Sequence, residues 1–338
     1  MKTEDMEPDV GTDAGTDVEI DVGRMELSSY MLAVIEKLKH EQKYAAAHGY
    51  LCALHSFQDF AGGRGVPLPM NEVFRPERLK AYEEKKARPL KPNSVTCYMS
   101  SLRAVYNRWM PAGTPGHDAK MFADVHTRVV SQTKRALQGW QMEKVLAGSP
   151  FIAGQTALDY FRLMFLCRGM PFIDLAHLRK RDLQGRYLVY LRHKTKRPMR
   201  VELCPEALRL LREYGKKSPD SPYLLPILDA DTSGGWGLYK DYQDALRHFN
   251  RELAPAVELL LPGVRVSSYT ARHTWATLAY HMGLPLGVIS QSLGHASIRV
   301  TETYLKPFEN ERLDKANKQL IAAVKKGKWK SFANNNIL

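Results

Sequence analysis

The chain has 338 residues, with 49 Lys and Arg against 36 Asp and Glu, so its formal net charge is +13 at neutral pH. This length is sufficient for two domains with separate cores, and no apolar run reaches the ~18 residues that a transmembrane helix needs. The four cysteines are scattered, which indicates free thiols in a reducing cytoplasm. His and acidic residues do not cluster at metal-ligand spacing, which argues against a metal-dependent nuclease.

The charge is unevenly distributed along the chain. Residues 1–25 contain eight acidic and two basic residues, a net charge of −6, which leaves +19 on the remainder. The acidic leader has few apolar residues and lacks the basic and apolar regions of a signal peptide, so we predict that it is disordered. The basic remainder favours binding to a nucleic-acid backbone, because neutralising phosphates releases condensed counterions.

Residues 26–125 show helical periodicity and predict a helical domain. Apolar residues recur at helical spacing within 27–38 and again within 50–60. The clearest helix follows Pro92, with Asn93 or Ser94 as its N-cap, and runs as far as Pro111.

A connector is predicted next. Residues 111–124 contain several Pro and Gly, and residues 126–136 carry Arg128 and Lys134. We interpret the whole segment as an interdomain linker whose basic residues follow a nucleic acid.

A β-hairpin is predicted in the second half of the chain. Residues 187–193 are β-rich, residues 194–198 are typical of a turn, and residues 199–203 alternate as a strand. Arg192 lies two residues before Lys194, and period-two alternation places both side chains on one face of the strand.

The most informative stretch is 269–304. Arg272 lies in the first turn of a predicted helix, His295 follows the Gly that ends a second short helix, and Tyr304 lies nine residues beyond His295 on a short third helix. These residue types suit the cleavage of a phosphodiester. A guanidinium holds the phosphate oxygens, an imidazole donates or manages protons, and a phenol attacks phosphorus.

An Arg-His pair opening a helix, a Leu-Gly-His some twenty residues later and a Tyr nine residues after that His resemble the catalytic half of the tyrosine recombinases. The resemblance implies that Tyr304 forms a covalent 3′-phosphotyrosine while Arg272 holds the phosphate and His295 assists. It also implies that Lys194 protonates the leaving 5′ oxygen. Because the phosphotyrosine retains the bond energy, neither ATP nor a metal is required, and we expect no cofactor.

Two positions depart from the family's pattern. Pro171 occupies the place of the first catalytic Arg, and Tyr269 occupies the place of a His or Lys. The site is then either inactive or rebuilt, and we favour a rebuilt site in which Arg192 or Arg168 supplies the missing guanidinium. Integrases of mobile elements in Bacteroidetes-type bacteria resemble the chain in the same departures.

The resemblance implies a mostly α fold with a small β-sheet, in which a helical, SAM-like core-binding domain precedes a mixed α/β tyrosine-recombinase catalytic domain. It implies a site-specific recombinase that integrates or excises a mobile element and acts on double-stranded DNA as a tetramer, with accessory DNA-bending proteins and no membrane partner. A helix predicted over 313–324 serves self-association or packs within its own chain. Two alternatives stay open: a catalytically weakened DNA-binding protein of the same fold, and a type IB topoisomerase-like enzyme that nicks and reseals. The expected domains are the leader 1–25, the core-binding domain 26–125, the catalytic domain 126–325 and a basic tail 326–338.

Overall fold

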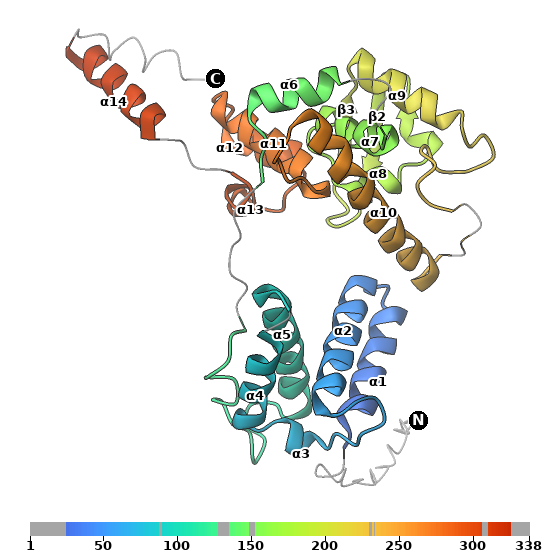
Figure 1. Cartoon of the computed structure of the whole chain (residues 1–338), viewed down its shortest axis with the longest axis vertical. Coiled ribbons are helices and arrows are strands. Elements are labelled where there is room, and N and C mark those ends of the chain that lie inside the picture. The colour runs from blue at the N-terminus through green and yellow to red at the C-terminus, as the bar shows by residue number, and fades with distance from the viewer. Residues whose placement is uncertain are drawn as a thin grey trace, which may run out of the picture. The chain divides into compact units, whose positions relative to one another are not determined.

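The computed structural model describes residues 25–87, 90–127, 135–148, 153–229, 232, 234–305 and 310–325. The chain divides into two compact units at Ser131 and Gln132, and the fold is mostly helical with one small sheet, as expected (Figure 1). Residues 1–24 of the acidic leader, the basic tail, Arg128 and Lys134 lie outside the described residues. In the described part of the chain, each helix is too short or too polar to cross a lipid bilayer.

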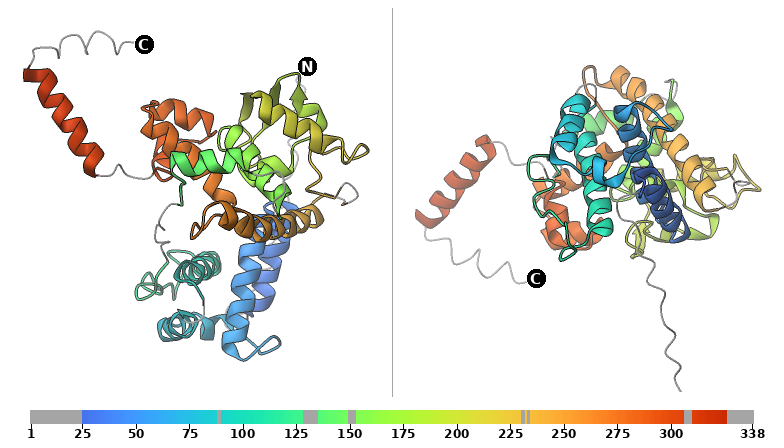
Figure 2. Two further views of the ribbon diagram at one scale, coloured as in Figure 1. Left: turned by 45° about the horizontal axis from the view of Figure 1, so that its top comes forward. Right: turned by 90° about the horizontal axis from the view of Figure 1, so that it is seen from below.

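The first unit is a bundle of helices around its own apolar core. The predicted stripes fall on α1 and α2, which run side by side in both views of Figure 2, and bury Met31, Leu54 and Phe57. α5 begins with Pro92 as its first residue, where the missing N–H costs nothing, so the predicted N-cap one or two residues later is wrong. The helices of this unit are α1 (Leu27–His40), α2 (Tyr44–Ala61), α3 (Met70–Val73), α4 (Pro76–Ala87) and α5 (Pro92–Trp109).

The segment after α5 folds back onto the first unit. The backbone N–H of Asp118 donates to the Tyr106 hydroxyl of α5 at 2.7 Å, and the backbone N–H of His126 donates to Glu83 of α4 at 2.7 Å. Residues 111–124, which we interpreted as a linker, therefore belong to the first unit, because these turns satisfy their hydrogen bonds on its helices.

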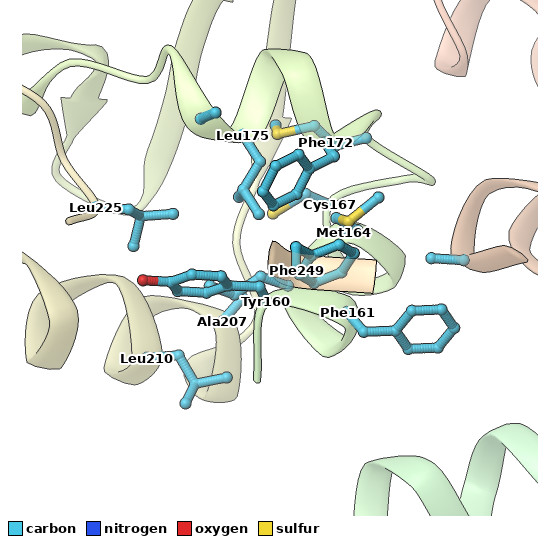
Figure 3. Close-up of a cluster of buried hydrophobic side chains, with 14 of the residues drawn as sticks. Tyr160, Phe161, Met164, Cys167, Phe172, Leu175, Ala207, Leu210, Leu225 and Phe249 are labelled. Carbon is cyan, nitrogen blue, oxygen red and sulfur yellow. The ribbon is translucent and has the colours of Figure 1, made fainter. Parts of the chain in front are cut away.

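The core of the second unit surrounds α7, whose side chains are buried on nearly every face. Figure 3 shows aromatic and sulfur-containing side chains of α7 and its neighbours packed together. Among them Phe172 of α8 stacks on Phe249 of α10, with 4.4 Å between the ring centroids. The helices of this unit are α6 (Gly139–Ala147), α7 (Gln155–Leu166), α8 (Phe172–Ala176), α9 (Pro205–Gly215), α10 (Trp236–Leu260), α11 (Ser268–His281), α12 (Leu286–Ser292), α13 (Ile298–Glu302) and α14 (Asn310–Lys325), with a 3₁₀ turn η1 (Lys180–Asp182).

The sheet is an antiparallel meander of β1 (Leu183–Gln184), β2 (Tyr187–Leu191) and β3 (Pro198–Glu202) in chain order. The predicted hairpin is present, and alternate residues of β2 and β3 are buried against the core of the unit. However, β2 ends at Leu191 and the turn begins there. The prediction that Arg192 and Lys194 share one strand face is therefore wrong, since Arg192 is buried and Lys194 is exposed in the turn.

Candidate active site

Arg272 lies at the centre of the candidate site. α11 starts directly after Ser267, whose backbone N–H donates to Thr270 Oγ1 at 3.0 Å in a capping box, and this start places Arg272 near the beginning of the helix. Arg272 is 2 % exposed. Its Nη1 donates to the Gly169 carbonyl at 2.8 Å, and its Nη2 donates to the Leu293 carbonyl at 2.7 Å. The guanidinium is thus held on both sides by backbone oxygens and needs no carboxylate to fix its orientation.

His295 lies against this guanidinium. α12 ends in a turn at Gly294, whose φ is +64°, and His295 follows with 5 % exposure. Its Nε2 lies 2.7 Å from Nη2 of Arg272 and its Nδ1 lies 2.8 Å from Thr301 Oγ1. Because a guanidinium can only donate, Nε2 accepts and Nδ1 carries the proton toward Thr301. Burial, with the charges of Arg272 and Arg192, lowers the pKa of His295 to about 3, so the imidazole is neutral at neutral pH.

Tyr304 lies in the turn directly after α13. Its backbone N–H donates to the Thr301 carbonyl at 2.9 Å. The Tyr304 ring is half-buried, with its centroid 4.8 Å from the rings of both His273 and His295. The Cζ atom of Arg272 lies 5.3 Å from the same centroid. The structure therefore gathers the three groups that the spacing singled out.

A second guanidinium, that of Arg192, is buried beside the first. Arg192 is 6 % exposed and its Nη1 donates to the Leu293 carbonyl, the oxygen that Arg272 also contacts. Its Nε lies 3.1 Å from Oδ2 of Asp174, a buried carboxylate. Burial raises the pKa of Asp174, and the charge of Arg192 acts against that rise.

The balance of charge around the shared carbonyl is positive. Burial and the neighbouring Arg192 lower the pKa of Arg272 to about 10, so its guanidinium remains protonated at neutral pH. Asp174 compensates one of the two guanidinium charges at most. The remaining positive charge and the donor groups around it would attract an anion.

Arg168 lies elsewhere in the fold. It follows α7 with a φ of +59°, and its Nη1 donates to the Arg200 carbonyl of β3 at 3.3 Å. Of the two arginines considered for the missing one, Arg192 is therefore the one that shares a partner with Arg272. Pro171 ends the segment before α8, where it serves as the N-cap residue and supplies no charge.

Lys194 and Tyr269 border the site from the solvent side. Lys194 is exposed in the β2–β3 turn, close enough for its charge to lower the pKa of His295. Tyr269 is 57 % exposed and its ring lies 6.3 Å from that of His273. Partial burial of its hydroxyl raises the pKa of Tyr269, so the phenol stays neutral and can form hydrogen bonds.

Sequence reasoning missed two polar groups that shape the site. Neither Asp174 nor Thr301 received a role from the sequence. Both are buried, and each contacts a residue that had been singled out, Arg192 and His295. Their signal in the sequence is weak, because a lone Asp or Thr in a helix is ordinarily a solvated residue. Within the described ranges, no three His, Cys, Asp or Glu side chains lie close enough together to hold a metal ion.

Comparison with known proteins places this site in context. Residues 155–311 match the family described as the phage integrase family. A tyrosine recombinase of Pseudothermotoga lettingae is 36 % identical over 56 residues, which are 17 % of this chain. That match spans 20 % of the relative's length, about a fifth of it.

Solved structures are similar to most of the chain. A lambda integrase dimer bound to a COC′ core site is 17 % identical, with a TM-score of 0.58, and the match covers 83 % of this chain and 95 % of that one. A Tn1549 transposon integrase in complex with a circular intermediate DNA is 16 % identical, with a TM-score of 0.59, and covers 88 % and 99 %. A lambda integrase tetramer bound to a Holliday junction is 16 % identical, with a TM-score of 0.54, over 84 % and 78 %. At these identities the likeness is one of fold.

Proposed function

The chain belongs, through residues 155–311, to the phage integrase family of tyrosine recombinases, and on this premise we propose that it is a site-specific recombinase that cuts and rejoins double-stranded DNA. One observation carries the proposal: two buried guanidiniums, Arg272 and Arg192, share a carbonyl beside His295 and Tyr304, with a single carboxylate to offset them. This surplus of positive charge next to a phenol suits a phosphodiester, whose transition state carries additional negative charge on its oxygens.

The first step is binding of the phosphate. Arg272 and Arg192 turn donors from the Leu293 carbonyl to the non-bridging oxygens, and a planar guanidinium can satisfy two oxygens at once. Arg192 thereby takes the role that Pro171 cannot fill. When Nη2 of Arg272 moves to the phosphate, Nε2 of His295 loses its donor and becomes free to accept a proton.

The second step is cleavage. The oxygen of Tyr304 attacks phosphorus, and the bond from phosphorus to the 5′ oxygen breaks. The phenolic proton passes to Nε2 of His295, whose basicity rises when the bound phosphate offsets the charges of Arg272 and Arg192 that lower its pKa. Lys194 gives a proton to the departing 5′ oxygen. The products are a 3′-phosphotyrosine and a free 5′ hydroxyl, and attack by a 5′ hydroxyl of a second strand reverses each transfer and rejoins the DNA.

Strand exchange between two sites requires several copies of the chain. We propose a tetramer on DNA in which α14 contacts a neighbouring copy. Leu320, Ile321 and Val324 of α14 are exposed apolar residues at helical spacing. The lambda integrase tetramer on a Holliday junction supports this arrangement by similarity of fold. Integration or excision of a mobile element is the biological setting we propose.

Tyr304→Phe tests the function directly. On a duplex with a nick beside the scissile phosphate, the wild type should accumulate a covalent protein–DNA adduct, because the cleaved end diffuses away before resealing. Tyr304→Phe removes only the attacking oxygen, so it should give no adduct while DNA affinity stays within about twofold. Tyr280→Phe, on α11, is the matched control and should form the adduct normally.

The outcomes separate the alternatives. Adduct formation by Tyr304→Phe would exclude this residue as the nucleophile. No adduct with the wild type would favour a DNA-binding protein that retains the fold. An adduct without any product in an assay with two recombination sites would favour a topoisomerase-like enzyme that nicks and reseals.

A further inference from the structure

We propose that Arg197 is a positioning residue that locks the second half of the β2–β3 turn onto the loop 293–296 and thereby holds Lys194 in line with the departing oxygen. The proposal rests on the proposed function, because it assigns a support to the proton donor of that reaction. Arg197 was not among the residues that the sequence singled out.

The contacts between the turn and the loop form a continuous series. Nη1 of Arg192 donates to the Leu293 carbonyl, and Thr195 Oγ1 donates to the Gly294 carbonyl at 3.3 Å. Arg197 then donates through Nη1 to the His295 carbonyl and through Nη2 to the carbonyl of the next residue at 3.4 Å. Four consecutive carbonyls thus each receive a side-chain donor from a six-residue turn.

These carbonyls are good acceptors for a physical reason. Leu293 is the C-cap residue of α12, so the loop carbonyls lie beyond the helical hydrogen bonds and at the negative end of the helix dipole. Guanidiniums satisfy such oxygens and are attracted by the dipole. The fit is close, since a Cβ on Gly294 would lie 2.5 Å from Cδ of Arg192 and 3.0 Å from Sδ of Met199.

Of the β2–β3 turn and the loop 293–296, the loop is the one held in place by other elements of the fold. The backbone N–H groups of Gly294 and His295 donate to carbonyls of α12 at 2.9 and 3.0 Å, and Thr301 holds the His295 ring from α13. The first half of the turn is also secured, because the His193 backbone N–H donates to Oδ1 of Asp174 at 2.9 Å. The second half contains Lys196, whose φ of +54° is strained for a residue with a side chain.

Two side chains therefore tie this strained half to a fixed support, and Arg197 makes two of the three contacts while Thr195 makes one. The Arg197 backbone carbonyl accepts from the Arg192 N–H at 2.9 Å and closes the turn around Lys194. Without the Arg197 guanidinium, the exposed lysine keeps its charge and loses its fixed position. A misplacement of about 1 Å costs a reaction of this kind on the order of 10²-fold.

The test compares two substrates in single-turnover cleavage. One is ordinary DNA; the other carries sulfur in place of the bridging 5′ oxygen, and this sulfur leaves as a thiolate without needing a proton. Arg197→Ala should cleave ordinary DNA about 10²-fold more slowly than the wild type, and should cleave the sulfur substrate within a few-fold of it. Arg197→Lys keeps one donor and should lie between the two on ordinary DNA.

Controls keep the outcomes distinct. Lys194→Ala should be slow on ordinary DNA and rescued by sulfur, and Tyr304→Phe should be inactive on both; failure of either overturns the proposed function, on which the role of Arg197 rests, and is distinct from a failure confined to Arg197→Ala. Arg209→Ala removes an exposed arginine of α9 that pairs with Glu213, and should match the wild type. Equal slowing of Arg197→Ala on both substrates, or no slowing on ordinary DNA, overturns the proposal. If Arg197→Ala does not fold, the same comparison on Arg197→Lys decides it.

Discussion

At the scale of single residues, the shared Leu293 carbonyl concentrates the chemistry of the site. Two guanidiniums converge on one oxygen, and the like charges repel across a buried space. That repulsion is tolerated because backbone carbonyls and Asp174 surround the pair. A phosphate would give the two guanidiniums acceptors that carry a negative charge. In the free protein, keeping the two cations side by side therefore costs some folding stability.

Arg192→Ala is expected to slow cleavage by two to three orders of magnitude, about 3 to 4 kcal/mol, as for removal of one donor that stabilises transition-state charge. Arg192→Lys should restore only part of the rate, because lysine keeps the charge and lacks the bidentate fork. Single-turnover cleavage of a nicked duplex measures both. Arg168→Ala is the matched control, since its guanidinium contacts β3, and its effect should be the smaller one. The reverse ranking would assign the missing clamp to the end of α7.

The neutral state of His295 predicts a pH dependence of folding stability. Its pKa of about 3 in the folded protein lies below the usual value of 6.5, so the unfolded chain binds a proton in a range where the folded chain does not. This contribution to stability is complete above the unfolded pKa and is lost as the pH falls toward the folded one. Chemical denaturation from about pH 7 to about pH 5 should show falling stability, and His295→Gln should flatten that fall. His281→Gln, at the end of α11, serves as the control and should follow the wild type. Parallel curves for His295→Gln and the wild type would contradict the assignment.

At the scale of elements, the long periodic patterns predicted the structure well. The stripes in 27–38 and 50–60 became α1 and α2, and the helices around Arg272, His295 and Tyr304 formed near their expected places. The buried face of α11 was harder to predict. Met282, an apolar residue at the C-cap of α11, is 80 % exposed, whereas Thr274 and Thr277 are buried.

The reason is that α11 packs polar side chains inward to build the site. Thr274 Oγ1 accepts the backbone N–H of Leu137 at 2.9 Å, and Arg272 is among the most deeply buried side chains of the chain. Hydrophobic periodicity cannot detect a face of this kind. The same limit hid the pairing of Asp174 with Arg192, which depends on where a turn ends and not on local pattern. The narrower resemblance to Bacteroidetes-type integrases stays a prediction.

Gly294→Ala tests how closely the β2–β3 turn meets the end of α12. Gly294 has a φ of +64° and Gly283 a φ of +87°, so an alanine at either position would adopt a left-handed backbone, which costs roughly 1 to 2 kcal/mol of stability. Only at Gly294 would the new Cβ also meet neighbouring atoms, whereas at Gly283 nothing lies within 4 Å. Gly294→Ala should therefore be less stable in thermal denaturation than Gly283→Ala and should also cleave slowly. Equal stability and equal rates for the two variants would show that the Arg192 side chain moves aside readily to make room for the new Cβ.

At the scale of the whole molecule, charge and division into units frame the function. The chain carries +19 outside its acidic leader and folds into two compact units, each with its own hydrophobic core. Two domains were expected from the length, and the boundary between the units lies after residue 131, within the segment 111–136 interpreted as the linker and beyond the predicted boundary after residue 125. Composition could not show that 111–124 folds onto the first unit, because turns on a surface and turns in a linker use the same residues.

DNA affinity should depend steeply on salt. If six or more phosphates are contacted, the association constant is expected to fall at least ~10³-fold from about 50 to about 200 mM salt. Fluorescence anisotropy with a labelled duplex measures this slope, and addition of EDTA should change neither binding nor adduct formation. A shallow slope, or cleavage that stops on chelation, would contradict a metal-independent recombinase that binds through the phosphate backbone.

The side-chain hydrogen bonds from the β2–β3 turn to the loop 293–296 affect which substitutions the protein can accept. Every acceptor in that contact is a main-chain oxygen, and a side-chain substitution at any of those four positions leaves the oxygen in place. The donors, in contrast, are side chains, and each can be lost in a single substitution. Inherited change in these donor contacts must therefore arise on the hairpin, while the loop is constrained at Gly294 by the lack of room for a Cβ and at His295 by its part in the reaction.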